Sequence, residues 1–484
     1  MAAGAGRQTG QRAHGTDVVP RVGSAVPHRS ARSALLLGAV VAGCSGAETV
    51  LTDAGIGGGP PVEGCIDIHL DRYVMPDPLT WASVDVYARH PLWRDVTGLH
   101  AFWVGGRPDG TQMFLLVSTF DPDTGATLGT QVYDVFPPGV GFGALGIWDA
   151  VGNAAGSFAA AVYFDDGSDP YGAVDRVVLG TLADAGATLV WTPPWSRADY
   201  AVFHVGWDGE AFAVHAVSQS TPEIRLQRLL PDGTELGSAD YVGTITNIYP
   251  VESDTATDPV SGTTWFASNG EGLWLSGHGR DGTMLPGTEA QGGVTVVGQG
   301  VPPEAPGSAL DPAVATNGTL ALIAWNNSHN WPDEVRAQLL EGATPSADAA
   351  RLFYEVGGPA DRAAARPGEG WWMGQRWAKA GIESLWLDEQ GEQRMPSSVL
   401  LPFTPCTGPT CSPGQSDLFD ARAFSAVGYG DEVWLGFWDL SDSGLPLADY
   451  PTALSPYRLL RVKPGCVYQP NYVLAQSGAR GNGP

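Results

Sequence analysis

Positive charge is scarce in this chain. It carries 26 Lys and Arg residues against 52 Asp and Glu, a formal net charge of −26 at pH 7. Lysine occurs only at Lys379 and Lys463, and the other basic residues are arginines. A chain this acidic repels a nucleic-acid backbone and an anionic membrane surface, so we exclude nucleic acid as a partner.

The motifs of several enzyme classes are also missing. A P-loop requires Gly-Lys-Ser/Thr, yet Lys379 precedes Ala and Lys463 precedes Pro. The chain has neither a Gly-x-Ser-x-Gly elbow nor a His-Glu-x-x-His motif. Gly141–Gly146 match Gly-x-Gly-x-x-Gly, but the residues that follow predict a strand, whereas a dinucleotide needs a helix N-terminus. No catalytic residue or cofactor is identified, so the sequence leaves enzyme activity undecided.

Near the N-terminus, the apolar run Ala34–Gly43 is too short to span about 30 Å of hydrocarbon as a helix. It follows a basic segment and ends in small residues before Cys44, which is the layout of a signal peptide. Val41–Cys44 resembles the lipobox of bacterial lipoproteins. This resemblance implies that residues 1–43 are removed and that Cys44 is lipidated. An ordinary secretory peptide cleaved nearby is the alternative.

The segments on either side of this run complete the export signal. Residues 1–27 precede the basic segment, and a true start downstream of Met1 explains them. Residues 44–63 form a Gly-rich, flexible tether. We expect an exported protein whose anchor inserts into the lipid bilayer of the bacterial envelope. Ser45, by resemblance to enterobacterial sorting, favours the outer membrane and leaves the side open.

Four cysteines remain in the mature chain, and export places them in an oxidising compartment. Cys406 and Cys411 bracket a short loop that a local disulfide closes. Cys65 then pairs with Cys466 by elimination, as one of three connectivities. A zinc site is the competing interpretation, but CxxC spacing and nearby histidines are missing.

A recurring tryptophan suggests an internal repeat. The 65 Gly, 38 Pro and 17 Trp residues predict many short strands joined by tight turns. Tryptophans spaced 45 to 63 residues apart stand at 103, 148, 207, 265, 325, 371 and 434. The third copy predicts strands over Tyr200–Gly206, Glu210–Val217, Ile224–Leu230 and Glu235–Val242, with a Pro231–Thr234 turn before the last.

Four strands per repeat, seven times over, resembles a β-propeller. We therefore predict an all-β, seven-bladed β-propeller of four-stranded blades over residues 64–475, followed by a disordered tail, 476–484. Six or eight blades, or two β-sandwiches, are the alternatives. No WD40, kelch or Asp-box signature recurs; Val260 stands where an Asp-box has Asp. We expect Gly64–Met75 to complete the last blade against Leu459–Val462 or Val467–Pro470, with Cys65–Cys466 as a covalent latch.

Two groups of side chains are candidate metal ligands. If Asp208-Gly209 is the centre of a hairpin, His204 faces Ala213 and His215 lies diagonally on the same face. A third ligand is not visible there, and packed histidines are the simpler interpretation. Asp165, Asp166 and Asp169 are close enough in sequence to take Ca²⁺ weakly, the one cofactor the sequence suggests.

Two further groups combine flat aromatic rings with hydrogen-bonding groups, a combination that suits sugars. Asn326, His329 and Trp331 lie in a segment that we expect to be a loop, and Trp371 and Trp372 are adjacent. One tryptophan per blade is also expected in the core between blades.

Three functions follow from this sequence. The first is a lipid-anchored binding or interaction module of the cell envelope, with a glycan or an envelope protein as partner. The second is a hydrolase or lyase that acts on polysaccharide at a site in the propeller channel. The third is a structural envelope scaffold. Fold class alone does not separate them, and the ligand and the oligomeric state stay open.

Overall fold

The structure is a computed structural model of the chain. It describes residues 68–74, 83–84, 91–106, 112–140, 145–165, 174–194, 200–218, 224–241, 253–269, 273–285, 294–295, 309–318, 320–327, 334–341, 344–345, 350–354, 362–366, 370–377, 381–391, 398–399, 425–438 and 457–463. The chain divides into Met1–Thr49 and Val50–Pro484, and every described residue belongs to the second unit. Among these residues, no helix is long and apolar enough to cross a membrane. The predicted signal peptide, Cys44, the tether and the four remaining cysteines lie outside the described residues.

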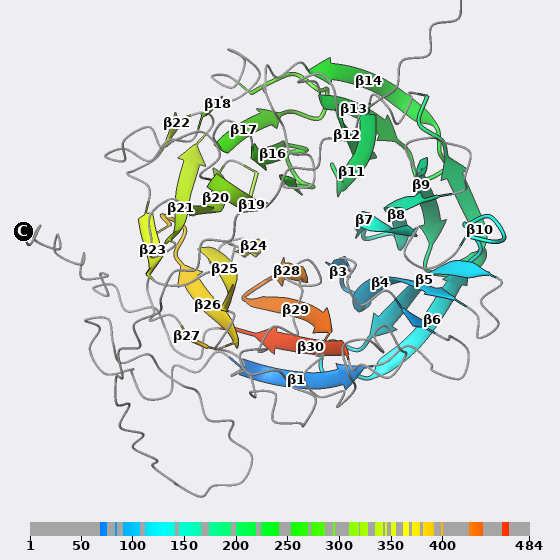
Figure 1. The fold of residues 1–484 in the computed structure, drawn as a ribbon, viewed down its shortest axis with the longest axis horizontal. Coiled ribbons are helices and arrows are strands. Elements are labelled where there is room, and N and C mark those ends of the chain that lie inside the picture. The colour runs from blue at the N-terminus through cyan, green and yellow to red at the C-terminus, as the bar shows by residue number, and fades with distance from the viewer. Residues whose placement is uncertain are drawn as a thin grey trace, which may run out of the picture. The chain divides into compact units, whose positions relative to one another are not determined.

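The described strands form seven antiparallel sheets, which we number I to VII in chain order (Figure 1). Sheet I contains β2 (Ser83–Val84), β3 (Leu92–Arg94), β4 (Leu99–Gly106), β5 (Met113–Phe120) and β6 (Thr127–Tyr133). Sheet II contains β7 (Leu145–Gly152), β8 (Ser157–Phe164), β9 (Val174–Thr181) and β10 (Asp184–Trp191). Sheet III contains β11 (Tyr200–Trp207), β12 (Phe212–Ser218), β13 (Ile224–Leu229) and β14 (Glu235–Tyr241).

The other four sheets follow the same plan. Sheet IV contains β15 (Ser253–Thr257), β16 (Thr264–Asn269), β17 (Leu273–His278) and β18 (Val294–Thr295). Sheet V contains β19 (Ala309–Thr316), β20 (Leu320–Asn327), β21 (Glu334–Glu341), β22 (Thr344–Pro345) and β23 (Ala350–Tyr354). Sheet VI contains β24 (Arg362–Arg366), β25 (Gly370–Trp377), β26 (Gly381–Leu387) and β27 (Ser398–Val399). Sheet VII contains β28 (Ser425–Tyr429), β29 (Glu432–Trp438), β30 (Tyr457–Val462) and β1 (Ile68–Val74).

Sheet VII joins the two ends of the described chain. Its strand order is β1-β30-β29-β28, so the earliest strand in the sequence pairs with the latest. Arg72 of β1 lies opposite Leu459 of β30 in this antiparallel pair. The expected pairing of Gly64–Met75 with Leu459–Val462 is therefore found over Ile68–Val74, and the alternative partner Val467–Pro470 lies outside the described residues.

Neighbouring sheets meet through their first strands. We call β3, β7, β11, β15, β19, β24 and β28 the inner strands. Each contacts the inner strand of the next sheet, and β28 of sheet VII contacts β3 of sheet I, so the contacts form a closed cycle (Figure 1). A cycle of this kind leaves no sheet at an open end and gives all seven inner strands a common centre.

The hydrophobic core lies between the sheets. Separate buried clusters join sheets I and II, II and III, III and IV, IV and V, and V and VI. Because a sheet inside such a stack is buried on both faces, its strands carry continuous apolar runs rather than alternating ones. The recurring tryptophans belong to this core, one to each sheet. Five lie in the strand that follows the inner strand of their sheet and are buried: Trp103, Trp265, Trp325, Trp371 and Trp434.

The predicted turns are also present. Pro231-Asp-Gly-Thr joins β13 to β14, and Gly233 has a φ of 82° there. Gly282 follows Asp281 in the turn after β17, with a φ of 79°. Glycine is the residue that adopts this left-handed conformation without a steric penalty, which explains the recurring Asp-Gly pairs.

Candidate functional site

A polar residue begins the turn after the inner strand in five of the sheets. Asp208 Oδ1, for example, accepts hydrogen bonds from the backbone N–H groups of Glu210 and Ala211, at 2.9 and 2.8 Å. Such side-chain acceptors stabilise a tight turn in place of a backbone partner. The equivalent residues of the other four sheets, Asp95, Asn153, Asp258 and Asn317, make the same kind of contact.

Four residues before these turn residues, three polar side chains reach from one inner strand to the next. Asp149 of β7 accepts a hydrogen bond from the Val205 N–H of β11, at 3.3 Å. His204 of β11 lies 2.9 Å from the Ser253 hydroxyl of β15. Asp254 of β15 accepts one from the Val314 N–H of β19, at 2.9 Å. These contacts fix the spacing of the inner strands around the common centre.

The inner strands enclose a cavity of about 520 Å³. All seven contribute to its described lining, which includes Arg94, Asp149, Trp207, Asp254, Val314, Ala363 and Tyr429. Pockets for small ligands range from about 300 to 1,000 Å³, so this cavity has the size of a binding site.

Hydrogen-bond donors gather at one end of this cavity, which we call the turn end. Arg94, Trp207 and Tyr429 each stand directly before a turn, and Asn153 begins one. The Arg94 guanidinium lies over the Tyr429 ring, 4.3 Å from its centroid, and its Nη1 donates to the Gly98 carbonyl. Four donors make no hydrogen bond with another described residue: Nη2 of Arg94, the Tyr429 hydroxyl, Nε1 of Trp207 and Nδ2 of Asn153. The turn end therefore offers unused donors to a ligand.

The carboxylates of the lining are differently placed. Asp149 lies three residues from Gly152, the last residue of β7, and Asp254 lies three residues from Thr257, the last residue of β15. Both carboxylates are therefore about 10 Å from the turn end at the usual strand rise. Each already accepts a backbone N–H from the next sheet. The cavity is thus divided into a donor-rich turn end and a deeper level with two engaged carboxylates.

A third carboxylate, Asp95, turns toward its own sheet. Its Oδ1 accepts from the Thr97 and Gly98 backbone and lies 3.3 Å from His100 Nε2. Burial raises the pKa of Asp95, but hydrogen bonds from Thr97 and His100 outweigh it and hold the pKa below its ordinary value. Burial is the main cause that lowers the pKa of His100, whose Nδ1 lies 3.0 Å from the Thr119 hydroxyl. This Asp–His–Thr arrangement ties the first turn to β4 and β5.

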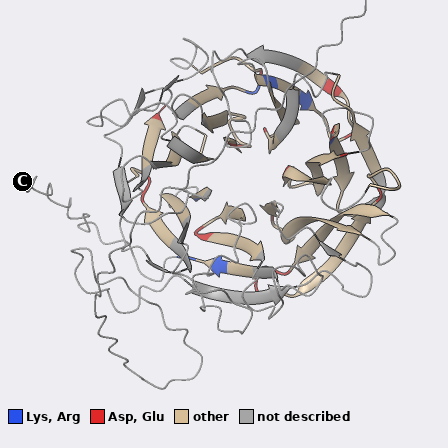
Figure 2. Ribbon diagram, in the orientation of Figure 1, with Lys and Arg blue, Asp and Glu red and all other residues tan. Residues whose placement is uncertain are grey.

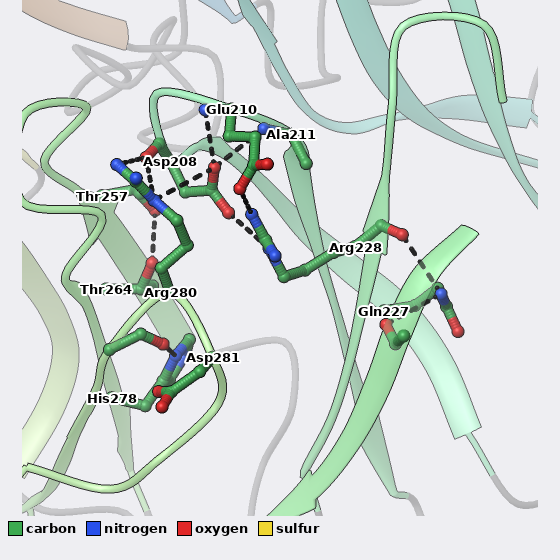
Figure 3. A network of polar contacts seen from close by, with 12 residues as sticks. Asp208, Glu210, Ala211, Gln227, Arg228, Thr257, Thr264, His278, Arg280 and Asp281 are labelled. Carbon is green, nitrogen blue, oxygen red and sulfur yellow. Dashed lines mark hydrogen bonds and ion pairs between the residues drawn. The ribbon is translucent and has the colours of Figure 1, made fainter. Parts of the chain in front are cut away.

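Another polar network holds sheets III and IV together at the turn end (Figure 3). Asp208 is almost fully buried and forms an ion pair of 2.7 Å with Arg228 of β13. A second nitrogen of Arg228 contacts Glu210, which is exposed. Arg280, from the turn after β17, donates two hydrogen bonds to the Asp208 carbonyl. Arginines are sparse on the described strands, and those of β13 and β30 stand out in Figure 2.

The structure corrects the predicted register of His204 and His215. The loop between β11 and β12 contains the four residues Asp208–Ala211 and is not centred on Asp208-Gly209. His204 therefore lies directly opposite His215, and Ala213 lies opposite Gly206. The nearest partner of His215 is His278 of sheet IV, with the two Nε2 atoms 3.0 Å apart. Figure 3 places His278 beside Asp281, close to the network of Asp208. All three histidines are buried.

The His215–His278 pair has the geometry of a hydrogen bond. The ring centroids are 5.2 Å apart while the nitrogens are 3.0 Å apart, so the rings point at each other nearly head-on. Two ligands of one metal would instead converge at an angle. His278 Nδ1 donates to the Gly279 carbonyl, so its Nε2 is the acceptor and His215 Nε2–H the donor. Across the described residues, no group of three His, Cys, Asp or Glu gathers as a metal site.

The pair favours neutral imidazoles. Burial is the main cause that lowers the pKa of His278, to about 4. Burial, together with the neighbouring His278 and His204, lowers the pKa of His215 well below its ordinary value. Both rings are therefore uncharged at neutral pH.

The remaining predicted residues are distributed as follows. Asp165 directly follows β8 and is half-buried. The other predicted residues of these groups, Asp166, Asp169, His329 and Trp331, lie outside the described residues. Asn326 belongs to β20 and pairs with Val335, so it is not in a loop. Trp371 and Trp372 have no exposed surface, and Trp372 donates to the Ser384 hydroxyl. Both tryptophans therefore lie in the core and do not contact a ligand as predicted.

The cavity residues were missed because no continuous motif contains them. They come from seven strands that are far apart in the sequence. A signal was present, however: the Asp or Asn residues at 95, 153, 208, 258 and 317 recur every 50 to 59 residues. Aligning the repeats on these turn residues, rather than on tryptophan, places Asp149, His204 and Asp254 at equivalent positions.

Comparison with known proteins identifies a type of fold and no family. No family model matches the chain, and no curated protein matches its sequence. The solved structure of the polysaccharide lyase Uly1 is similar with a TM-score of 0.50 at 8% identity, over 82% of this chain and 100% of that one. A putative 6-phosphogluconolactonase from Bacteroides uniformis has a TM-score of 0.41 at 15% identity, over 68% of this chain and 88% of that one. A subtype N11 neuraminidase-like protein of a flat-faced bat strain (H18N11) has 0.40 at 10%, over 84% and 97%.

The likeness to the polysaccharide lyase concerns the fold alone. Together with the antiparallel four-stranded sheets, it defines this chain as an all-β, propeller-like protein.

Proposed function

We propose that this chain is a seven-bladed β-propeller that binds a saccharide in its central cavity. The seven sheets and the closed cycle of inner-strand contacts support the blade count. Sheet VII, in which β1 pairs with β30, would be the blade that closes the ring.

The composition of the cavity carries this proposal. Its turn end combines the aromatic rings of Trp207 and Tyr429 with unused donors on Arg94 and Asn153. Sugars are recognised by flat rings that cover their C–H faces and by polar groups that bind their oxygens. Residues that only fill a core would have their polar groups paired within the protein. A binding module explains this unused capacity better than a scaffold does.

The placement of the protein follows from the N-terminal sequence. Lipidated Cys44 would anchor the chain to the envelope, and residues 45–63 would hold the propeller away from the bilayer. A single acyl chain binds membranes only marginally, so the anchor would need the several chains that a lipobox cysteine receives in the lipoproteins it resembles. Disulfides Cys65–Cys466 and Cys406–Cys411 would form in the same oxidising compartment.

An enzyme that acts on polysaccharide is the second candidate. Three carboxylates, Asp95, Asp149 and Asp254, line one cavity, and the similar solved structure is a polysaccharide lyase. However, Asp149 and Asp254 hold the backbone of the next sheet, and Asp95 holds its own turn. A general acid or base needs a carboxyl that is free to exchange a proton with the substrate. The geometry therefore favours binding over catalysis.

Calorimetric titration of the purified protein with soluble oligosaccharides tests the proposal. We expect saturable heat with at least one saccharide class and an unchanged chain length of the ligand afterwards. Shortened or unsaturated products in the same sample would instead establish the enzyme. No heat with any neutral or acidic saccharide would contradict saccharide binding.

A further inference from the structure

The described lining of the cavity contains one cation, Arg94, which forms no ion pair with a carboxylate of the described residues. Arg94 is half-buried, and its contacts within this part of the chain are with the Gly98 carbonyl and the Tyr429 ring. Three other half-buried arginines each face a carboxylate: Arg228 and Arg280 pair with Asp208, and Arg461 pairs with Asp123 and Glu432. A guanidinium that loses water and gains no counter-charge is unfavourable unless a ligand supplies one.

The guanidinium is also held in a defined orientation. Its face lies on the Tyr429 ring and Nη1 is fixed by the Gly98 carbonyl, 3.2 Å away. Nη2 keeps its hydrogen atoms for another acceptor. A planar, pre-oriented fork of N–H groups is the arrangement that binds carboxylates best.

The groups beside Arg94 at the turn end are donors too. The Tyr429 hydroxyl can donate, and Trp207 and Asn153 present N–H groups. The Asp95 carboxylate faces Thr97, Gly98 and His100 instead. Asp149 and Asp254 lie about 10 Å deeper at the usual strand rise. An anionic group at the turn end would therefore meet donors rather than carboxylates.

We infer that the saccharide bound by this cavity carries a carboxylate, which Arg94 receives at the turn end. This inference rests on the proposed function and narrows it to acidic sugars such as uronate oligomers. Arg94 is then the residue that discriminates acidic from neutral saccharides. Asp149 and Asp254 at the deeper level repel a second acidic group, so they orient the ligand with its carboxylate at the turn end.

Matched ligands test this without altering the protein. An oligogalacturonate and its methyl ester have the same chain and differ in the charge of the carboxyl group, and an oligoglucuronate pair repeats the comparison with another sugar. We expect calorimetry at fixed ionic strength to show about tenfold to hundredfold tighter binding of the acid than of the ester in at least one pair, the loss usual for a charged hydrogen-bonded pair.

Arg94→Gln should abolish that preference, so that the acid binds no more tightly than the ester, and an unaltered melting temperature shows that the variant is folded. Arg461→Gln is the matched control. It removes another half-buried arginine that lies over an aromatic ring, Trp434, but does not line the cavity. The acid preference should survive in this variant.

The other outcomes separate the two proposals. Equal or tighter binding of the esters, or binding of neutral glucans alone, would overturn the carboxylate inference and leave saccharide binding intact. An acid preference that persists in Arg94→Gln would overturn the role of Arg94. If no saccharide of either kind binds, the proposed function itself fails.

Discussion

His215 and His278 donate and accept one hydrogen bond across the boundary between sheets III and IV, with their Nε2 atoms 3.0 Å apart. In this arrangement His278 Nε2 carries no proton, because a proton there would face the N–H of His215 head-on. Each ring lies in the core, where a positive charge lacks water. This pair therefore links the stability of the protein to pH.

We expect the free energy of unfolding to fall as the pH decreases from 6.5 to 4. The pKa of His278 is about 4 in the folded protein and 6.5 in the unfolded chain. Between these values the unfolded chain binds the proton and the folded protein does not, so acid favours unfolding. The effect of His278 alone is on the order of 3 kcal/mol.

Urea unfolding at a series of pH values measures this loss. Below pH 4 the contribution of His278 levels off, and the carboxyl groups with lowered pKa values, such as Asp281, begin to contribute. A flat stability between pH 6.5 and 4 would show that the pair is not buried as described.

The contact of Asp254 with the Val314 N–H predicts a cost for its removal. Asp254→Ala should lower the free energy of unfolding by about 1–3 kcal/mol, because a buried N–H loses its acceptor. Asp254→Asn keeps an oxygen acceptor and should cost less. Chemical denaturation of both variants measures the difference, and equal stabilities would argue against the contact.

The two acidic partners of Arg228 should differ in their importance. Asp208 is almost fully buried, whereas 54% of the Glu210 side chain is exposed. Asp208→Ala should cost about 3 kcal/mol, since it leaves Nε of the partly buried Arg228 and two turn N–H groups without an acceptor. Glu210→Ala should cost less than about 1 kcal/mol, as is usual for exposed ion pairs. Similar losses in both variants would contradict the burial of Asp208.

Closure of the sheets by β1 can be tested by truncation. A protein that starts at residue 76 lacks β1 and leaves β30 as an unpaired edge strand, so we expect a lower melting temperature and aggregation. A protein that starts at residue 62 keeps β1 and should melt like the full chain. If both truncated proteins melt alike, β1 does not close sheet VII.

Much of this fold could be predicted from the sequence, because repeated local patterns encode it. The Asp-Gly turns and apolar runs located the strands of the third repeat, and the chain ends were expected to share a sheet. The predicted register of His204 was wrong because the loop after β11 spans the four residues Asp208–Ala211, whereas the prediction centred the hairpin on Asp208-Gly209. His278 was missed as the partner of His215, since the contact crosses from one sheet to the next.

Less of the candidate site than of the fold could be predicted from the sequence. Trp371 and Trp372 suggested a sugar-binding surface, but residue type does not distinguish a buried tryptophan from an exposed one. Arg94 and Tyr429 are more than 300 residues apart and meet only because β28 lies beside β3. Such a pair depends on the closure of the sheets, which sequence periodicity does not determine in detail.

In the proposed function the ligand occupies the space between the inner strands. Thr255 of β15 lines the cavity and is half-buried, so Thr255→Trp would fill part of that space. Leu128→Trp on the outer strand β6, where the side chain is exposed, adds the same group away from the cavity. Ala426→Trp of β28 is a second way to fill it.

Calorimetric titration of these three variants with a saccharide that binds the unaltered protein is the most direct measurement. We expect Thr255→Trp and Ala426→Trp to bind the saccharide at least about tenfold more weakly, because the added ring excludes it sterically. Leu128→Trp should bind with unchanged affinity. All three variants should keep the melting temperature within a few degrees. Unchanged affinity in both cavity variants would show that the ligand binds elsewhere and would contradict saccharide binding in the central cavity.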